Sequence, residues 1–176
     1  VATDANEIEE EELHAVLSTL EQAIGSFEKF RQAEGRAMEE DMSSRIKLIR
    51  EYLLQLDPHE EDRVIRLRQR LYQNLEEYLG KEKIDENRFE QEILFYLEKI
   101  DITEEKVRLE QHCIYFLEEL GKSYTQKGRK LSFISQEMGR EINTLGAKAY
   151  SSEIQRLVVN MKDELEKIKE QLNNIL

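Results

Sequence analysis

The sequence contains one proline, seven glycines, one cysteine and no tryptophan in 176 residues. So few helix breakers, together with 36% charged residues, are typical of long amphipathic helices, and we expect an all-α fold without a sheet. The single cysteine, Cys113, excludes an internal disulfide framework and favours a reducing, cytoplasmic location. The longest apolar run covers residues 93–97, far short of the roughly 20 residues that cross a bilayer, so no membrane role is expected.

The net charge of −12 is unevenly distributed along the chain. Residues 1–12 carry six acids and no base, whereas residues 122–148 carry six bases and two acids. An acidic chain is a poor partner for nucleic acid, but this segregation leaves one basic segment that could hold phosphates. Because the chain opens with Val1 and not with methionine, we interpret residues 1–12 as an acidic linker from a missing N-terminal domain.

Apolar residues recur at steps of three and four along most of the chain, which predicts helices. We expect an elongated antiparallel bundle, or coiled-coil hairpin, of about six helices in a single all-α domain. A long helical hairpin region would cover residues 13–120, and the C-terminal helices residues 121–176. Gly80 should end the second helix. The predicted helices cover residues 7–56, 57–79, 85–100, 103–124, 128–148 and 151–175.

Several helix starts are marked by residues that cap helices. Asp57 suits an N-cap because Pro58 follows it at the first helical position, where the missing N–H costs nothing. We expect Thr103 to cap the fourth helix and Ser151 or Ser152 to cap the last.

The last helix carries apolar residues at near-heptad spacing from Ile154 to Ile175, and such a seam needs a partner. The partner is either the first helix, folded back antiparallel, or another subunit. Periodicity does not separate the two.

The second predicted helix carries four arginines within eight residues. Such a cluster can bind phosphates, but acidic residues flank it on both sides, so a solvated face of mixed charge explains it equally well. The arginines are Arg63, Arg66, Arg68 and Arg70, and the flanking acids are Glu60, Glu61, Glu76 and Glu77.

Residues 128–148 combine a regular apolar stripe with residues that stabilise a helix poorly. A glycine inside a helix costs about 1 kcal/mol against alanine, so this segment is selected for more than helix stability. The stripe is Leu131, Ile134, Met138, Ile142 and Leu145, and the unfavourable residues are Gly139, Asn143, Thr144 and Gly146.

Glu137 and Glu141 stand one turn apart in this segment, where two carboxylates repel each other by a few tenths of a kcal/mol. A cation would relieve the repulsion. It could be Arg140 or an arginine of a neighbouring helix, or a divalent metal, which would suit a phosphodiester substrate.

On the preceding helix His112 shares a face with Arg108, and it is either a structural residue or a group that transfers protons.

The segment GRKLSFISQEMGREINTLGAK at 128–148, with the following residues 149–175 that include MKDELEKI, closely resembles the C-terminal region of the YicC/YloC family of bacterial stress-associated endoribonucleases. The resemblance extends upstream through residues 88–120 and 31–42. It implies an endoribonuclease that cuts structured or small RNA with Mg²⁺ or Mn²⁺, by hydrolysis or transesterification. It also implies a homo-oligomer, hexameric in the full-length protein, whose N-terminal α/β domain is absent from this chain.

The resemblance gives weight to ten positions, and we assign their roles from their chemistry. Glu137, Glu141 and Glu92 are expected to bind the metal. His112 is expected to transfer protons, with Arg140 and Lys148 completing the catalytic set around the two glutamates. RNA phosphates are expected at Arg129, Lys130, Arg140, Asn143 and Lys148. The ten positions are Glu92, His112, Arg129, Lys130, Glu137, Arg140, Glu141, Asn143, Lys148 and Glu153.

Three residues depart from the family's pattern. Ser132 stands where Asp is frequent, Gly139 where Asn is frequent, and Ala147 where Ser is frequent. If one of the missing polar groups is catalytic, this member would be slower or altered.

Two other functions account for part of the sequence. A non-enzymatic helical oligomerisation module explains the heptad seam and the net charge, but not the glycines and polar residues at 139–146. An RNA-binding adaptor would bind through the basic residues without metal-dependent cleavage.

Overall fold

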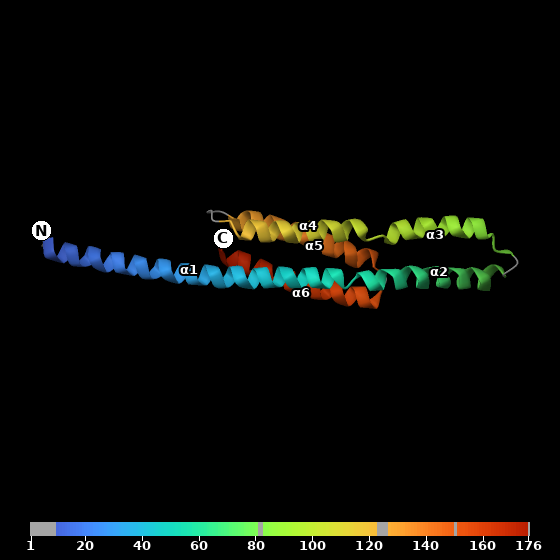
Figure 1. Cartoon of the computed structure of the whole chain (residues 1–176), viewed down its shortest axis with the longest axis horizontal. Helices are drawn as coiled ribbons and strands as arrows, with labels where there is room; N and C mark the ends of the chain where they lie inside the picture. The colour runs from blue at the N-terminus through green and yellow to red at the C-terminus, as the bar shows by residue number, and fades with distance from the viewer. Residues whose placement is uncertain (1–9, 81–82, 123–126, 150, 176) are drawn as a thin grey trace, which may run out of the picture. The chain divides into compact units, whose positions relative to one another are not determined.

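A computed structural model describes residues 10–80, 83–122, 127–149 and 151–175 of the chain. These residues form helices throughout and include no strand, which confirms the all-α prediction (Figure 1). The helices are α1 (Glu10–Leu54), α2 (Asp57–Leu79), α3 (Glu86–Ile100), α4 (Thr103–Leu120), α5 (Lys127–Lys148) and α6 (Ser152–Ile175).

The chain divides into two units whose limit falls within α1, at residues 1–40 and 41–176. The division predicted at residues 12 and 120 stays a prediction, and residues 1–9 of the predicted linker lie outside the described part. In the first unit, no described side chain is buried. Seven of its large apolar side chains are 50% to 63% exposed: Leu13, Val16, Leu17, Leu20, Ile24, Phe27 and Phe30.

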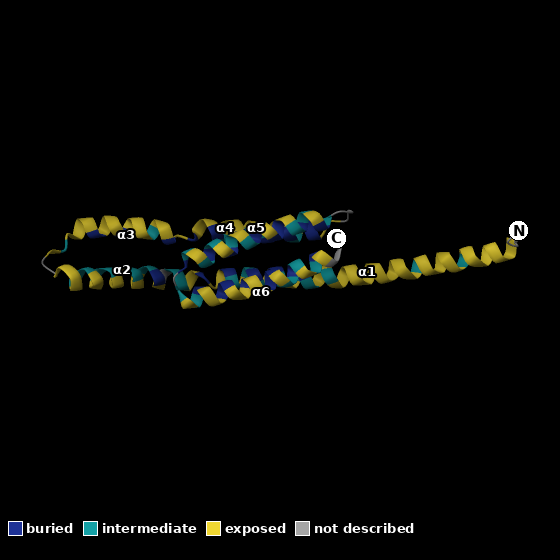
Figure 2. Ribbon diagram, turned by 180° about the vertical axis from the view of Figure 1, so that it is seen from behind, coloured by how far each residue is buried: buried dark blue, intermediate teal, exposed yellow. Residues whose placement is uncertain are grey.

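The core of the second unit lies between α4, α5, α6 and residues 41–54 of α1. The helix α5 packs against both α4 and α6, and α2 pairs with α3. Figure 2 shows the buried residues concentrated on α4, α5 and α6, while α3 is mostly exposed. The apolar stripe predicted for α5 is buried along its whole length and faces these neighbours.

The apolar seam of α6 has its partner within the chain. Arg45 Nη1 donates a hydrogen bond to Glu164 Oε2 at 2.9 Å, and Gln171 Nε2 donates to Asp41 Oδ2 at 3.0 Å. Residue numbers that decrease along α1, from 45 to 41, are matched by numbers that increase along α6, from 164 to 171, so the two helices are antiparallel. The helix α6 packs mainly against α5, and these two hydrogen bonds also join it to the C-terminal part of α1, the partner within the chain that the sequence left open.

Two predicted caps are wrong. The helix α2 begins at Asp57 itself, because Leu56 already has helical dihedral angles of φ −71° and ψ −34°, and no side chain caps the turn. The Asp57 carboxylate instead accepts a hydrogen bond from Lys106 of α4. At the start of α4, Asp101 Oδ1 accepts from the backbone N–H of Thr103 at 2.9 Å and from its hydroxyl at 2.6 Å. Asp101, and not Thr103, therefore supplies the capping acceptor.

Two other helix ends agree with the sequence. Gly80 follows the last residue of α2 with φ of +78°, a conformation that glycine adopts without strain. At the start of α6, Ser151 Oγ accepts from the backbone N–H of Ile154 at 3.5 Å, which identifies Ser151 as the cap.

Gly146 has a packing reason for being glycine. A Cβ atom at this position would lie 3.1 Å from Val158 Cγ1 of α6, closer than side-chain atoms normally pack. At Gly139 a Cβ atom would find ordinary contact distances, with Leu165 Cδ2 at 3.4 Å. The close approach of α5 and α6 thus explains one of the unfavourable residues of α5 and leaves Gly139 unexplained.

Cys113 is fully buried on α4, and burial raises the pKa of its thiol to about 12. The thiol behaves as an apolar core group. In the described part of the chain, none of the helices combines the length and hydropathy that crossing a membrane requires.

Candidate functional site

The residues predicted to act on RNA lie mainly on α4 and α5, which run antiparallel. Three ion pairs define how the two helices are aligned. Lys148 Nζ lies 2.8 Å from Glu105 Oε1, Arg108 Nη1 lies 4.0 Å from Glu141 Oε1, and Lys130 Nζ lies 2.8 Å from Glu119 Oε2. The C-terminal end of α5 therefore faces the N-terminal end of α4.

Two buried glutamates of α4 bind lysines that the sequence assigned to RNA. Glu105 is 5% exposed and pairs with Lys148, while Glu119 is fully buried and pairs with both Lys130 and Lys122. A buried carboxylate is very costly unless a cation lies beside it. Hydrogen bonds from Lys130, and then from Lys122, lower the pKa of Glu119.

Each of these glutamates keeps one carboxylate oxygen, Glu105 Oε2 and Glu119 Oε1, buried without a hydrogen-bond partner among the described residues. Neither glutamate was predicted from the sequence to be buried. The signal was present: Glu119 follows the buried Phe116 by three residues, on the face of α4 that packs inward.

Glu137 and Glu141 are both largely screened from solvent, with side chains 23% and 12% exposed. Arg140 Nη1 lies 3.3 Å from Glu137 Oε1, and the Arg108 guanidinium lies 4.0 Å from Glu141, beyond hydrogen-bond distance. Arginines from α5 and α4 therefore relieve part of the repulsion between the two carboxylates. Neither arginine is buried, since their side chains are 75% and 54% exposed.

His112 is half-buried on α4, one turn beyond Arg108. Since Arg108 is level with Glu141 across the antiparallel pair, the next turn of α4 brings His112 level with Glu137. The helix alignment thus places the predicted proton-transfer residue at the level of one predicted metal ligand, Glu137.

The remaining basic and polar candidates on α5 are more accessible. Arg129 and Asn143 are exposed, and the Arg140 carbonyl accepts a hydrogen bond from the Thr144 hydroxyl at 3.1 Å. Lys130 also lies over the ring of Tyr115, with its Nζ 4.9 Å from the ring centroid.

Two of the three departures from the family's pattern can be placed further. The Ser132 carbonyl accepts a hydrogen bond from the Ser135 hydroxyl at 2.7 Å, and Ala147 is exposed.

Glu92 lies elsewhere. It is exposed on α3, beside a cavity lined by residues of α2, α3 and the segment that joins them, among them Lys83, Asp85 and Arg88. In the described ranges, no three His, Cys, Asp or Glu side chains form a group that could hold a metal ion. The chain therefore does not bring Glu92 together with Glu137 and Glu141.

Comparison with known proteins identifies the family. The family model described as "Endoribonuclease YicC-like, C-terminal" matches residues 56–176. Two curated relatives, each named "Probable endoribonuclease YicC", are 36% identical to this chain. The relative from Clostridioides difficile aligns with 99% of this chain and 60% of its own length, and the relative from Haemophilus influenzae with 61% and 37%. The chain thus spans about three fifths of the longer-matching relative, and it belongs to the endoribonuclease YicC-like family, of which it contains the C-terminal region.

Proposed function

We propose that this chain is the helical part of an endoribonuclease that binds structured or small RNA over the α4–α5 face and cleaves it with Mg²⁺ or Mn²⁺. The observation that carries the proposal is the placement of Glu137 and Glu141 one turn apart, with Glu137 level with His112, in a chain of this family. The two curated relatives, named as probable endoribonucleases, support the type of reaction.

The two glutamates fit a metal that takes only part of its ligands from protein. Mg²⁺ is commonly bound by one or two carboxylates and completes its coordination with water and substrate phosphates. Glu137 and Glu141 offer two such carboxylates, and no third ligand joins them in the described ranges. When bound there, the metal would polarise a phosphoryl oxygen and lower the pKa of a coordinated water.

The chain's own residues would orient the RNA and move protons. Arg140 and Arg108 flank the two glutamates and would hold phosphate oxygens next to them. Arg129 would extend the contact along the strand, whereas Lys130 and Lys148 remain tied to buried glutamates and act mainly through the local potential. His112 would exchange a proton with the attacking or the leaving oxygen.

The test is cleavage of a short RNA hairpin by this chain with Mn²⁺ or Mg²⁺, compared with EDTA. Glu137→Gln keeps the shape of the side chain and removes its charge, so it should abolish metal-dependent cleavage while leaving the helical circular dichroism unchanged. Glu170→Gln, at an exposed position of α6, is the matched control and should cleave normally. Full activity of Glu137→Gln would remove Glu137 from the site. Binding without cleavage by the unaltered chain would instead favour the adaptor function.

The ends of the product distinguish the two reactions. In transesterification the ribose 2′-oxygen loses its proton and attacks phosphorus, and the 5′-oxygen leaves with a proton, so the products carry a 2′,3′-cyclic phosphate and a 5′-hydroxyl. In hydrolysis water supplies the attacking oxygen, and no cyclic phosphate forms. Mass spectrometry of the fragments reads the difference directly.

A second function, assembly, is favoured by the first unit. Seven of its described large apolar side chains recur at helical spacing and are half or more exposed. We infer that residues 10–40 pair with another copy in a homo-oligomer, hexameric in the full-length protein. Analytical ultracentrifugation of Leu17→Lys with Phe27→Lys should give a smaller species than the unaltered chain, with Glu21→Lys as control. An unchanged mass would assign the assembly contacts to other parts of the protein.

A further inference from the structure

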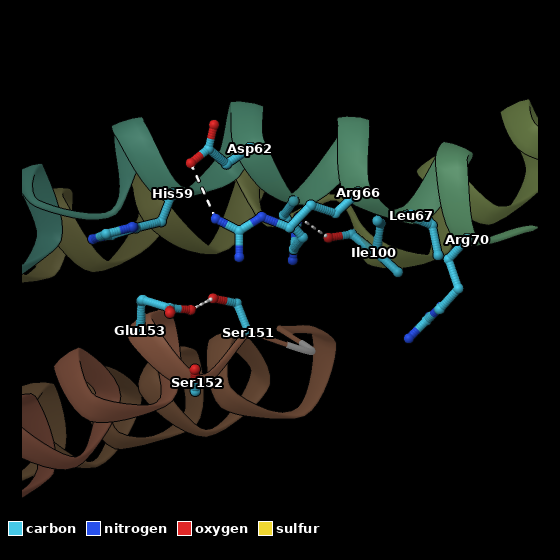
Figure 3. Close-up of a pocket in the computed structure, with 10 residues that line it drawn as sticks. His59, Asp62, Arg66, Leu67, Arg70, Ile100, Ser151, Ser152 and Glu153 are labelled. Carbon is cyan, nitrogen blue, oxygen red and sulfur yellow. Dashed lines mark hydrogen bonds and ion pairs between the residues drawn. The ribbon is translucent and has the colours of Figure 1, made fainter.

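A cavity of about 240 Å³ lies between α2 and the start of α6. Half of its polar lining is arginine or histidine, and all of these residues come from α2: His59, Arg63, Arg66 and Arg70. The other polar residues of the lining are Asp62, Ser151, Ser152 and Glu153. Figure 3 shows the Arg66 guanidinium reaching from α2 toward Ser151 and Glu153 at the start of α6. The cavity borders the α4–α5 face, because Arg63, which also lines it, donates a hydrogen bond to the Lys148 carbonyl.

The arginines of the α2 cluster differ in whether they line this cavity. Arg66 and Arg70 line it and are exposed, so both are accessible to a ligand. Arg68 points elsewhere: it pairs with Glu90 of α3 and takes no part in the lining. A solvated mixed-charge face therefore describes Arg68 and in part Arg66, which pairs with Asp62, but Arg66 and Arg70 both line the cavity.

Arg63 provides a second, independent sign that an anion belongs here. It is only 9% exposed, and its Nη2 and Nη1 donate to the carbonyls of Ile100 at 2.7 Å and of Lys148 at 3.4 Å. Its Nε is buried and has no hydrogen-bond partner among the described residues. No carboxylate forms an ion pair with it in the described ranges. Burial lowers the pKa of its guanidinium, while the charges of Glu60 and Asp101 act in the opposite direction. A phosphate in the cavity would add to the compensation of this buried charge.

The start of α6 stabilises negative charge, and Glu153 already supplies one there that competes with a ligand. The Glu153 carboxylate accepts a hydrogen bond from the Ser151 hydroxyl at 2.7 Å, and hydrogen bonds from Ser151, its own backbone N–H and Ser152 lower its pKa to about 2. The helix dipole acts in the same direction. Asp62 is the second acid in the lining, and its carboxylate already accepts from Arg66 at 3.3 Å. Arg66 keeps further N–H donors free for a ligand.

We propose that this cavity binds a backbone phosphate of RNA, held by Arg66 and Arg70 with the buried charge of Arg63 behind them. A phosphate matches the planar, multiple N–H donors of arginine, which explains why arginine and not lysine occurs at these positions. The identification of the ligand as RNA rests on the proposed function, whereas the preference for a phosphate group rests on the cavity itself. The contact would fix the RNA beside Lys148, at the end of the α4–α5 face.

The first test uses inorganic phosphate and does not depend on RNA. In ¹⁵N-labelled protein, a phosphate titration at constant ionic strength should give saturable shifts of the Ser152 and Glu153 amide signals. The shifts should be lost in Arg66→Ala with Arg70→Ala and kept in Arg68→Ala, the matched control from the same helix. Glu153→Gln removes a competing negative charge and should tighten phosphate binding about threefold. Absence of saturable shifts, or equal shifts in the double variant, would overturn the phosphate site.

The second test asks whether the phosphate belongs to RNA. For a single-stranded oligoribonucleotide, each lost phosphate contact lowers the slope of log K against log salt concentration by about 0.7. We expect this decrease in the double variant and none in Arg68→Ala. An unchanged slope, in a chain that still binds inorganic phosphate, would reject RNA as the ligand. The proposed function is tested separately by Glu137→Gln. If the Arg66→Ala, Arg70→Ala variant kept the salt dependence of RNA binding while the unaltered chain cleaved RNA, only the phosphate site in the cavity would be refuted.

Discussion

The basic residues of α5 and those of α2 look alike in the sequence but differ in their surroundings. On α5, Lys130 and Lys148 are bound to buried glutamates of α4. On α2, Arg66 and Arg70 are exposed beside a cavity, and the one acid paired with Arg66, Asp62, is itself exposed. The local excess of positive charge on α5 therefore overstates what is available to an RNA strand, while the balanced charge of α2 conceals a concave basic surface. Whether a basic side chain can bind phosphate depends on its partner within the fold.

The strongest test of this comparison is the stability of Lys148→Ala. It leaves the Glu105 carboxylate buried and unpaired, which we expect to lower the free energy of unfolding by about 2 kcal/mol. The cost falls below that of breaking a fully buried pair because the Lys148 side chain is 32% exposed. Urea unfolding measures it, with Lys162→Ala as an exposed control. Adding Glu105→Gln should recover part of the loss, and no recovery would argue that Lys148 stabilises the fold by other contacts.

A smaller effect is expected for Arg129, the exposed basic residue of α5. Arg129→Ala should leave stability unchanged and lower RNA affinity about threefold at low salt, with a smaller difference at high salt, because the contact acts by counterion release. Filter binding at two salt concentrations provides the measurement. If Lys148→Ala, under conditions where it is folded, weakened RNA binding more than Arg129→Ala, the distinction between paired and available residues would be wrong.

The smallest effect is a pH dependence at Glu119. Its folded pKa lies below the ordinary value of 4.5 because Lys130 and Lys122 hydrogen-bond to it. The resulting stabilisation is present above the unfolded pKa and is lost as the pH falls through the folded pKa. Lys130→Met should therefore be less stable than the unaltered chain at pH 7, with the difference shrinking below pH 4.5. Because Lys122 still binds Glu119, the deficit will be modest. A difference that grows in acid would contradict the assignment.

Much of the fold could be predicted from the sequence, because apolar spacing specifies helices and their buried faces. The stripe of α5 from Leu131 to Leu145 is buried as predicted, and α2 ends at Gly80. Errors occurred where a distant residue decides a local feature. Asp57 resembles an N-cap, but Leu56 is already helical and Lys106 takes the carboxylate. The local sequence at residues 50–60 does not show that Asp57 will pair with Lys106, 49 residues further along the chain.

For the candidate site, the sequence specifies the spacing of residues along each helix but not the partners that they meet on other helices. Glu137 and Glu141 must lie one turn apart on any helix, whereas the alignment of Glu137 with His112 depends on the antiparallel packing of α4 and α5. Glu92 was grouped with them on resemblance alone, and the described residues place it on α3 beside α2. The arginine cluster was noticed, yet its cavity requires residues from α6 that lie far away in the sequence.

The buried thiol of Cys113 allows local unfolding of the second unit to be measured by chemical labelling. A thiolate is the reactive form, and the burial that raises this pKa to about 12 also keeps reagents away from the sulfur. A thiol-labelling reagent can therefore modify only those molecules in which α4 has separated from its neighbours, even transiently. Since the chain has a single cysteine, the labelling rate in native buffer measures how often that separation occurs, without any engineered probe.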